Sequence, residues 1–298
     1  MIKITGASGF IGNNLIPYLQ RQRKNVEVIS RKELNDLNEQ LLVDTEVIIH
    51  LAGKAHDLKN ISDPNEYHVV NYELTKNLYD AFLNSNASKF IFISSVKAAA
   101  DTVETVLSED VVPNPVTPYG KSKLRAEQYI QSQPLPLGKS YYILRPCMIH
   151  GPANKGNLNL LYQLVKKGIP YPLASFENKR SFLSVENLCF IINELIIQAN
   201  VPSGIYHMAD DEPLSTNDVV EIFSLSLKRK ARIWHINKSF ICFMAYMGDR
   251  LKLPLNSEKL SKLIENYVVS NEKIKRALNI KLPIETKDGL MITARSFQ

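Results

Sequence analysis

Short apolar runs alternate along the first half of the chain with longer segments whose apolar residues recur at helical spacing. Leu15, Ile16 and Leu19 mark the first of these helices, and Asn65 to Leu83 forms another. Strand-like runs lie near residues 2–5, 26–30, 47–51, 90–94 and 141–145. Strands that alternate with helices predict an α/β fold built on a doubly wound parallel sheet.

The second half of the chain shows a different pattern. Helical spacing recurs over Asn217 to Leu227, Ser257 to Ile264 and Asn271 to Leu278, with short strand-like pieces between them. A chain of 298 residues can bury a large core, and this length allows one or two domains.

Three glycines stand between the first strand and the first helix. Gly6, Gly9 and Gly12 follow the run Ile2-Lys3-Ile4 directly, and Phe10 and Ile11 lie between the last two glycines. In a strand-to-helix turn, backbone N–H groups and the helix N-terminus bind a pyrophosphate. The spacing therefore predicts a dinucleotide site.

The residues after the second strand bear on which dinucleotide binds. An acidic residue here usually bonds the ribose hydroxyls of NAD, whereas arginine accommodates the 2′-phosphate of NADP. This chain has Ser30-Arg31, which predicts a preference for NADP(H), while the nearby Glu33 leaves NAD(H) open.

A candidate catalytic group combines Ser94-Ser95, at the end of the fourth strand-like run, with Tyr119 and Lys123. Residues four apart on a helix share one face. A lysine ammonium there should lower the pKa of the tyrosine hydroxyl, which is ordinarily near ~10. A serine hydroxyl opposite can bond the same substrate oxygen, so the group predicts proton transfer coupled to hydride transfer.

These ordered segments resemble the extended short-chain dehydrogenase/reductases, specifically the NAD-dependent epimerase/dehydratase family acting on nucleotide sugars. The resemblance covers nearly the whole chain. It implies a Rossmann domain of residues 1–152 plus 182–204 and a smaller α/β substrate domain of residues 153–181 plus 205–298. It also implies a homodimer through helices near 65–83 and 118–130.

The resemblance assigns roles residue by residue. Ser95, Tyr119 and Lys123 match the catalytic residues of the family. The expected substrate-binding residues are Asn157 and Arg180 for the nucleotide diphosphate and His56 and Lys97 for the sugar. The full set expected to bind cofactor is Gly6, Gly9, Phe10, Ile11, Gly12, Ser30, Arg31, Asp36, Leu37, Leu51, Ala52, Gly53, Asn71, Ser94, Tyr119, Lys123 and Pro146.

Three reactions occur in the family. Dehydratases carry an Asp-Glu pair after the catalytic serine or threonine, and Val96-Lys97-Ala98 at this place argues against dehydration. Arg31 favours a reductase with exchangeable NADPH, of the kind that reduces a UDP-4-keto-6-deoxy-N-acetylhexosamine for surface polysaccharide synthesis. A UDP-hexose 4-epimerase is the alternative. A non-catalytic cofactor sensor on the same fold is an alternative of another class.

Composition adds limits. Three cysteines without paired spacing suggest a reducing cytosol, and the N-terminus shows no signal peptide, so a cytoplasmic enzyme is expected. The six histidines show no metal-ligand spacing, and His50 is interpreted as a core residue at a strand end.

The net charge of +6 suits an anionic UDP-sugar, and we expect no nucleic-acid partner. Lys228 to Arg232 is interpreted mainly as a solvated face, with peripheral membrane contact as the minor alternative, and the longest apolar stretch, Phe240 to Gly248, is too short to span a bilayer.

Overall fold

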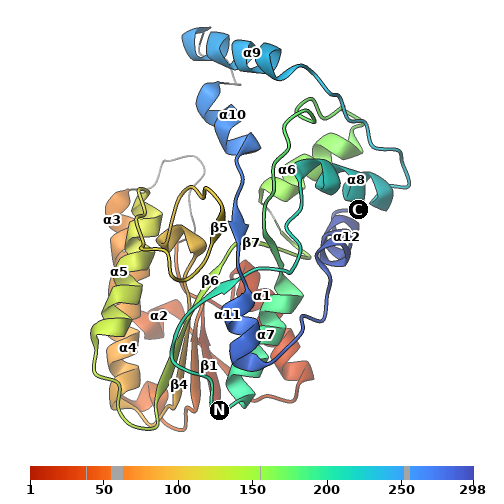
Figure 1. Ribbon diagram of the computed structural model, residues 1–298. Helices are drawn as coiled ribbons and strands as arrows, with labels where there is room; N and C mark the ends of the chain where they lie inside the picture. Colours follow the sequence, from red (N-terminus) through yellow and green to blue (C-terminus); the bar gives the residue numbers. More distant parts are fainter. Residues whose placement is uncertain (38, 55–62, 155, 252–255) are drawn as a thin grey trace.

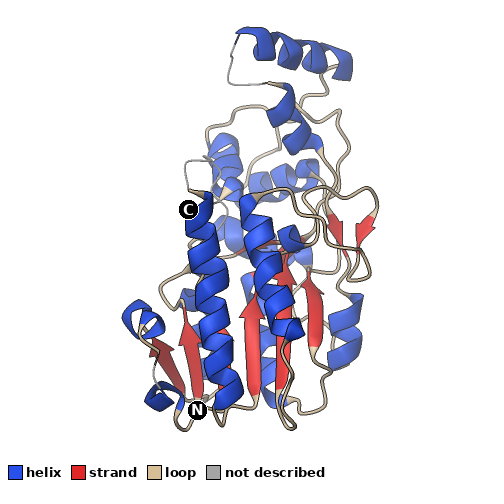
Figure 2. Cartoon of the chain, turned by 90° about the vertical axis from the view of Figure 1, so that its left-hand side faces the viewer, coloured by secondary structure: helices blue, strands red, loops and turns tan. Residues whose placement is uncertain are grey.

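Six parallel strands form the central sheet of the computed structural model, which describes residues 1–37, 39–54, 63–154, 156–251 and 256–298 (Figures 1 and 2). In spatial order they are β2 (Val26–Ile29), β1 (Ile2–Thr5), β3 (Val47–His50), β4 (Lys89–Ile93), β6 (Ser140–Pro146) and β9 (Gly204–Met208). The order reverses between β1 and β3, the kind of point where the carboxyl ends of strands leave a crevice for ligands. The predicted doubly wound parallel sheet is confirmed.

Helices cover both faces of this sheet. One face is covered by α1 (Phe10–Arg21), α7 (Val185–Ile197) and α11 (Glu272–Leu278). The other carries α2 (Arg31–Asn35), α3 (Pro64–Tyr67), a π-helix η2 (His68–Glu73), α4 (Leu74–Asn84) and α5 (Pro118–Ser132). The strands are apolar on both sides, because side chains alternate between the two buried faces.

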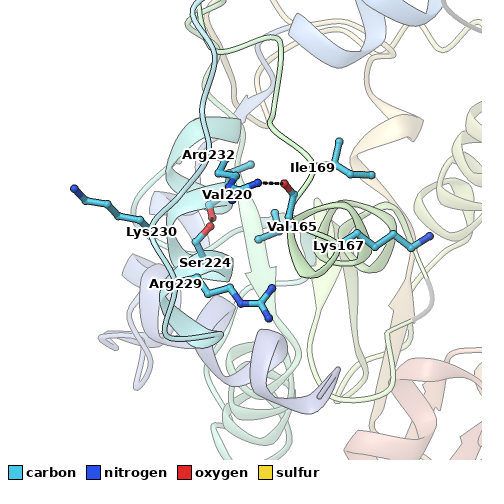
Figure 3. A pocket seen from close by; sticks show the side chains of 9 residues that line it. Val165, Lys167, Ile169, Val220, Ser224, Arg229, Lys230 and Arg232 are labelled. Carbon is cyan, nitrogen blue, oxygen red and sulfur yellow. Dashed lines mark hydrogen bonds between the residues drawn. The ribbon is translucent and has the colours of Figure 1, made fainter.

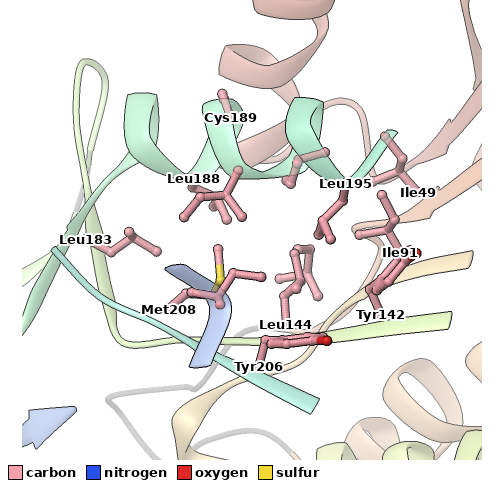
Figure 4. Packing of buried hydrophobic residues seen from close by; sticks show 14 of the residues in the cluster. Ile49, Ile91, Tyr142, Leu144, Leu183, Leu188, Cys189, Leu195, Tyr206 and Met208 are labelled. Atoms are coloured by element: carbon pink, nitrogen blue, oxygen red, sulfur yellow. The ribbon is translucent and has the colours of Figure 1, made fainter. Parts of the chain in front are cut away.

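Each face has its own core. Ile49 and Ile91 point to the α7 side and pack with Leu188 and Leu195 (Figure 4). Residues one position away in the same strands, such as Ile48 and Phe90, join the cluster on the α4 and α5 side, whose members include Leu78, Phe82, Ala126 and Ile130. This arrangement fixes the register of the strands, and with it the positions of the residues at their carboxyl ends.

The remaining helices share a third core, separate from the two cores of the sheet. Its helices are α6 (Asn157–Lys166), α8 (Thr216–Ser226), α9 (Lys238–Leu251), α10 (Ser257–Ile264) and α12 (Thr286–Ser296). Two small parallel sheets pair β7 (Met148–His150) with β8 (Phe182–Ser184), and β5 (Val106–Leu107) with β10 (Val268–Val269). Short 3-10 turns lie at Glu39–Leu42 (η1) and Val96–Ala98 (η3).

The chain returns to the central sheet for longer than the sequence indicated. The predicted second crossing ended at residue 204, but the sixth strand, β9, runs from Gly204 to Met208. Helix α11, expected in the substrate domain, also packs against the core of the sheet through Ile274 and Leu278. Both segments are too short to reveal their partner by periodicity alone.

Among the described residues, no helix is both long enough and apolar enough to pass through a membrane.

Candidate functional site

The start of α5 is held against the segment that follows β4. Thr117 caps the helix, accepting a hydrogen bond from the N–H of Gly120 at 3.2 Å. The carboxylate of Asp101 accepts from the N–H groups of Val116 at 2.6 Å and Thr117 at 3.2 Å. A Cβ at position 120 would lie 2.3 Å from the carbonyl oxygen of Lys97, so glycine permits this close packing.

This packing brings the three predicted catalytic residues together. The hydroxyl of Ser95 forms a hydrogen bond with that of Tyr119. Lys123 is one helical turn further, buried, and its Nζ donates to the carbonyl oxygen of Ile93 at 2.9 Å. A Cβ on Gly53 would come within 3.1 Å of that Nζ, so Lys123 lies beneath the loop that follows β3.

Burial has the largest effect on the pKa values of Tyr119 and Lys123. It raises the pKa of Tyr119, although the hydrogen bond from Ser95 opposes this. Burial also lowers the pKa of Lys123 to about 8, against the attraction of the Glu127 carboxylate. The predicted depression of the Tyr119 pKa is therefore not seen in this structure, because desolvation of the phenolate outweighs the other effects. A protonated Tyr119 is the form that can donate a proton to a substrate oxygen.

Asn71 connects the loop after β3 to helix α5. Its Oδ1 accepts from the N–H of Lys54 at 2.7 Å, and its Nδ2 donates to the carbonyl of Lys54 at 3.1 Å. The same Nδ2 donates to the Oγ of Ser122 at 3.0 Å, and that hydroxyl donates to the carbonyl of Tyr119 at 2.7 Å. Asn71 lies in the π-helix η2, a distortion that is frequent at functional sites.

A buried chain of hydrogen bonds continues from Asn71 back to β1. The backbone carbonyl of Asn71 accepts from the hydroxyl of Thr75 at 2.8 Å, and Thr75 Oγ1 lies 2.9 Å from Nε2 of His50. Nδ1 of His50 lies 2.7 Å from Thr5 Oγ1, which accepts from the N–H of Ala52 at 3.1 Å. Because Thr75 donates its proton to Asn71, its oxygen can only accept from Nε2 of His50. The hydroxyl of Thr5 is then able to donate to Nδ1 of the neutral ring. The pKa of His50 is lowered to about 3, first by burial and then by the charge of Lys123.

The glycine turn fits close to this chain. Gly6 has φ +71°, and a Cβ there would lie 2.6 Å from the nitrogen of Ala52. A Cβ on Gly12 would lie 2.4 Å from the carbonyl oxygen of Ala7. Helix α1 begins at Phe10, after the N-cap Gly9, so its free N–H groups face the crevice at the switch point. The turn has the backbone approach that a dinucleotide pyrophosphate requires.

Arg31 and Glu33 have separate roles after β2. Glu33 closes a capping box on α2, accepting from the N–H of Ser30 at 2.8 Å, while Ser30 Oγ accepts from the N–H of Glu33 at 3.3 Å. Arg31 is exposed and lines a cavity of about 520 Å³ whose other walls include Gly53 and Val70. A carboxylate already used in a helix cap is less available to ribose hydroxyls, so this geometry favours the interpretation of Arg31 as a phosphate ligand.

The predicted substrate-binding residues differ in their exposure and in the contacts that they make. Nζ of Lys97 donates to the carbonyl of Asp101 at 2.8 Å and lies 4.3 Å from the ring centre of Tyr267. Arg180 is partly buried, and its guanidinium donates to the carbonyl and carboxylate of Glu265, each at 3.2 Å. Asn157 is exposed at the first position of α6, and His56 lies outside the described residues. Arg180 would have to exchange these contacts to bind a diphosphate.

The other predicted cofactor residues lie along the same crevice. Leu51, Ala52 and Gly53 follow β3 directly, and Asp36 is the exposed C-cap of α2, followed by the half-buried Leu37. Ser94 directly follows β4 and Pro146 is the last residue of β6, and both are buried. Their contacts with a cofactor stay predictions.

A buried ion pair beneath the site was not predicted. Glu127, one turn after Lys123 on α5, binds the guanidinium of Arg145 and accepts from the hydroxyl of Ser94. Arg145 is 1 % exposed and Glu127 is fully buried. Glu127, four positions after Lys123, is visible in the sequence as a charged residue on the same helix face. Its partner Arg145 lies on strand β6, and spacing along the chain does not reveal that pairing.

The model of the NAD-dependent epimerase/dehydratase family matches residues 2–209. The chain belongs to this family. It is therefore an NAD(P)-dependent enzyme of the extended short-chain dehydrogenase/reductase type, as its sequence predicted. A UDP-glucose 4-epimerase of Vibrio cholerae is 29% identical over 317 aligned positions, covering 99% of this chain and 95% of that protein.

Two further relatives extend the comparison. An N-acetyl-α-D-glucosaminyl-diphospho-ditrans,octacis-undecaprenol 4-epimerase of Escherichia coli O157:H7 is 26% identical, covering 92% of this chain and 84% of that protein. The structure of RMD from Pseudomonas aeruginosa complexed with NADPH superposes with a TM-score of 0.75 at 20% identity, covering 99% of this chain and 98% of that one. The last comparison shows the shared fold.

We expect Gly6→Ala to weaken dinucleotide binding and to lower the free energy of unfolding. The left-handed backbone alone costs a non-glycine residue about 1–2 kcal/mol, and the contact with Ala52 adds to it. Gly138→Ala is the matched control, because Gly138 has φ +83° and nothing within 4 Å of its Cβ position. Urea unfolding and dinucleotide titration would show equal effects in both variants if the close approach at Gly6 were unimportant.

The neutral His50 predicts acid sensitivity. Below its unfolded pKa of about 6.5, the unfolded chain binds a proton that the folded chain, with a His50 pKa of about 3, does not. Stability should therefore fall as the pH is lowered through this window, by about 1.4 kcal/mol per pH unit below about pH 6. In His50→Gln this contribution should be absent, whereas His235→Gln, at an exposed site, should keep it. Urea unfolding at several pH values measures the slopes, and identical slopes in all three proteins would contradict the prediction.

Proposed function

We propose that the enzyme transfers a hydride to or from C4 of a UDP-hexose. The observation that carries this proposal is the Ser95–Tyr119 hydrogen bond at the carboxyl end of β4, with Lys123 buried one turn away and the glycine turn across the crevice. The dinucleotide would supply or accept the hydride. Gly6, Gly9 and Gly12 would hold its pyrophosphate and Arg31 its adenosine end.

The residues of the chain then have defined tasks. In the reducing direction Tyr119 donates its hydroxyl proton to the C4 oxygen, and Ser95 bonds the same oxygen and orients it. Lys123, charged below about pH 8, stabilises the phenolate that Tyr119 becomes. Asn71 keeps α5 and the loop after β3 in register. Arg180 and Asn157 would hold the diphosphate, and Lys97 the sugar.

A 4-keto-hexosamine reductase that uses NADPH is the first candidate. Its support is Arg31 on the wall of the cavity beside Gly53, with Glu33 retained in the helix cap. The raised pKa of Tyr119 also suits a proton donor. The proposed setting is surface polysaccharide synthesis in the cytoplasm by a homodimer.

A 4-epimerase is the second candidate. Its support is the Vibrio cholerae relative, a UDP-glucose 4-epimerase that aligns with 99% of this chain. The Escherichia coli relative is named for a hexosamine carried on a polyprenyl diphosphate. Both substrates contain a sugar diphosphate, the group assigned here to Arg180 and Asn157.

Mass spectrometry of the dinucleotide released from the denatured protein separates the two candidates. Stoichiometric NAD favours the epimerase, because an epimerase must return the hydride it removes. An empty site or traces of NADP(H) favour the reductase, which should then oxidise NADPH with a UDP-4-keto sugar. Absence of both UDP-hexose epimerisation and keto-sugar reduction would overturn the proposal.

Arg31→Ala should weaken NADP(H) binding about tenfold to a hundredfold, the range for a lost hydrogen bond to a charged group. NAD(H) binding should change little, because NAD has no 2′-phosphate. Lys32→Ala is the matched control, since Lys32 is the adjacent exposed cation on α2. Titration of each variant with both dinucleotides measures the effect, and equal losses for NADP(H) and NAD(H) would count against a 2′-phosphate contact.

A further inference from the structure

Helix α9 exposes an apolar face that the rest of the described chain leaves uncovered. Only a narrow strip of the helix is buried, made of Ile241, Ala245 and Gly248, on the side that contacts α10. Phe240 and Phe243 are each 57% exposed. Met244 and Leu251 are exposed as well, and Met247 is half-buried.

These five apolar residues lie on one side of the helix. At 100° per residue, positions 240, 243, 244, 247 and 251 fall within a single arc of about 100°. The remaining exposed arc carries Lys238, Ser239, Cys242, Tyr246, Asp249 and Arg250. Single exposed apolar residues are ordinary, but a continuous exposed stripe marks a contact surface.

Figure 1 shows α9 at the end of the molecule furthest from the central sheet, with α10 between it and the body, and Figure 2 shows the same arrangement from the side. The Rossmann core therefore does not lie against α9.

The charge around the stripe indicates what that partner is. Residues 222–248 contain five lysines and arginines and no aspartate or glutamate. The cations Lys228, Arg229, Lys230, Arg232 and Lys238 are all exposed, and they directly precede the stripe. Trp234, the single tryptophan of the chain, is 57% exposed in the same segment.

Part of this cluster lines a cavity of about 460 Å³ between α6 and α8 (Figure 3), and Ser95, Tyr119 and Lys123 are not among its lining residues. NH1 of Arg232 donates to the carbonyl of Gly168 at 3.1 Å, and NH1 of Arg229 donates to that of Lys166 at 3.0 Å. These bonds fix the two guanidinium groups at the C-terminal end of α6, while Lys230 extends outward in Figure 3. The result is a fixed cationic surface on the segment that leads along the chain from α8 to α9.

We propose that α9 docks on an anionic lipid bilayer surface, with its stripe among the acyl chains and the basic segment 228–238 against the headgroups. An amphipathic helix of this kind lies in the interface plane, held by buried apolar area and by attraction to anionic lipids. An exposed tryptophan beside it is typical of membrane interfaces. This inference goes beyond the proposed function and does not depend on it.

Docking of α9 would also bring the substrate cleft close to the bilayer. Arg180 donates to backbone carbonyls at the C-terminal end of α10, the helix on which α9 rests. The part of the cleft assigned to the diphosphate is thus joined by one short helix to the element on the bilayer, so the enzyme would act at the membrane surface.

Flotation of the full chain with phosphatidylcholine vesicles, with and without phosphatidylglycerol, tests the proposal. The protein should float with vesicles that contain phosphatidylglycerol and stay behind with phosphatidylcholine alone. Phe240→Ser/Phe243→Ser should lower the partition by about tenfold or more, since each phenylalanine loses its apolar burial. The matched control is Leu137→Ser/Leu160→Ser, which removes two exposed leucines outside α9 and should float like the original protein.

Each other outcome overturns the inference. It is wrong if the unaltered protein fails to float with anionic vesicles, or if both double variants float equally well. A second copy of the chain is the other possible occupant of the stripe. Light scattering after size exclusion would reveal this, because Phe240→Ser/Phe243→Ser would then dissociate an oligomer that does not bind vesicles. Dinucleotide binding by each variant confirms that it is folded.

Discussion

Tyr119→Phe should lower turnover about 10²-fold or more, the contribution of a positioned acid or base. The substitution removes the hydroxyl that bonds Ser95 and leaves the ring packed edge-on against Tyr67, with ring centres 6.0 Å apart. The fold of α5 does not depend on this hydroxyl, since the helix start is held by Thr117 and Asp101. Dinucleotide affinity should stay close to that of the original enzyme, so the loss should appear in kcat.

Tyr129→Phe is the matched control on the same helix. Its hydroxyl donates to the carboxylate of Asp80 at 2.5 Å, on the side of α5 that faces α4. This variant should keep nearly full turnover. If Tyr119→Phe turned over at a rate near that of Tyr129→Phe, the proton would have to come from another group and the assignment of Tyr119 would be wrong.

The central sheet and the proximity of Ser95, Tyr119 and Lys123 were predictable because their signals are local. Apolar runs of strand length separated by helical spacing require a parallel sheet with both faces covered. Ser95, Tyr119 and Lys123 are short-range features, placed at a strand end and along one helix face. In a parallel sheet, strand ends and helix starts meet at one edge, so the three residues had to come close together.

The features that sequence reasoning missed depend on contacts between distant segments. Nothing local indicates that Thr5, His50 and Thr75 form one chain of hydrogen bonds, because each belongs to a different element. The pKa of Tyr119 was predicted in the wrong direction, since the sequence shows the nearby lysine but not the burial of the phenol. The same limit applies to α9, whose apolar residues are visible in the sequence although their exposure is not.

Glu33 illustrates how a structure reassigns a residue. In the sequence its carboxylate competes with Arg31 as the ligand of the adenosine ribose. In the structure it closes a capping box with Ser30, which gives its charge a structural purpose. The prediction about NADP(H) thereby gains a physical reason that spacing alone did not provide.

Arg145→Leu should lower the free energy of unfolding by about 3–5 kcal/mol, the cost of leaving a buried charge without its partner. The guanidinium makes bonds of 3.0 Å and 2.5 Å to the two carboxylate oxygens of Glu127, and both side chains are almost completely buried. Lys262→Leu is the matched control, because its pair with Glu258 is exposed and such pairs contribute little to stability. Urea unfolding of each variant measures the difference.

The double variant Arg145→Leu/Glu127→Leu separates the two possible causes of that loss. If the unpaired carboxylate is responsible, removal of Glu127 as well should recover much of the stability, because two apolar side chains can replace a buried ion pair at little cost. If lost packing around Arg145 is responsible, the double variant should be no more stable than the single one. If the double variant recovers stability, its activity can be measured without interference from unfolding. The effect of Glu127 on catalysis can then be tested, since this carboxylate raises the pKa of Lys123 against the effect of burial. Without the Glu127 carboxylate the pKa of Lys123 should be lower. As the pH is raised, the double variant should therefore lose activity at a lower pH than the original enzyme does.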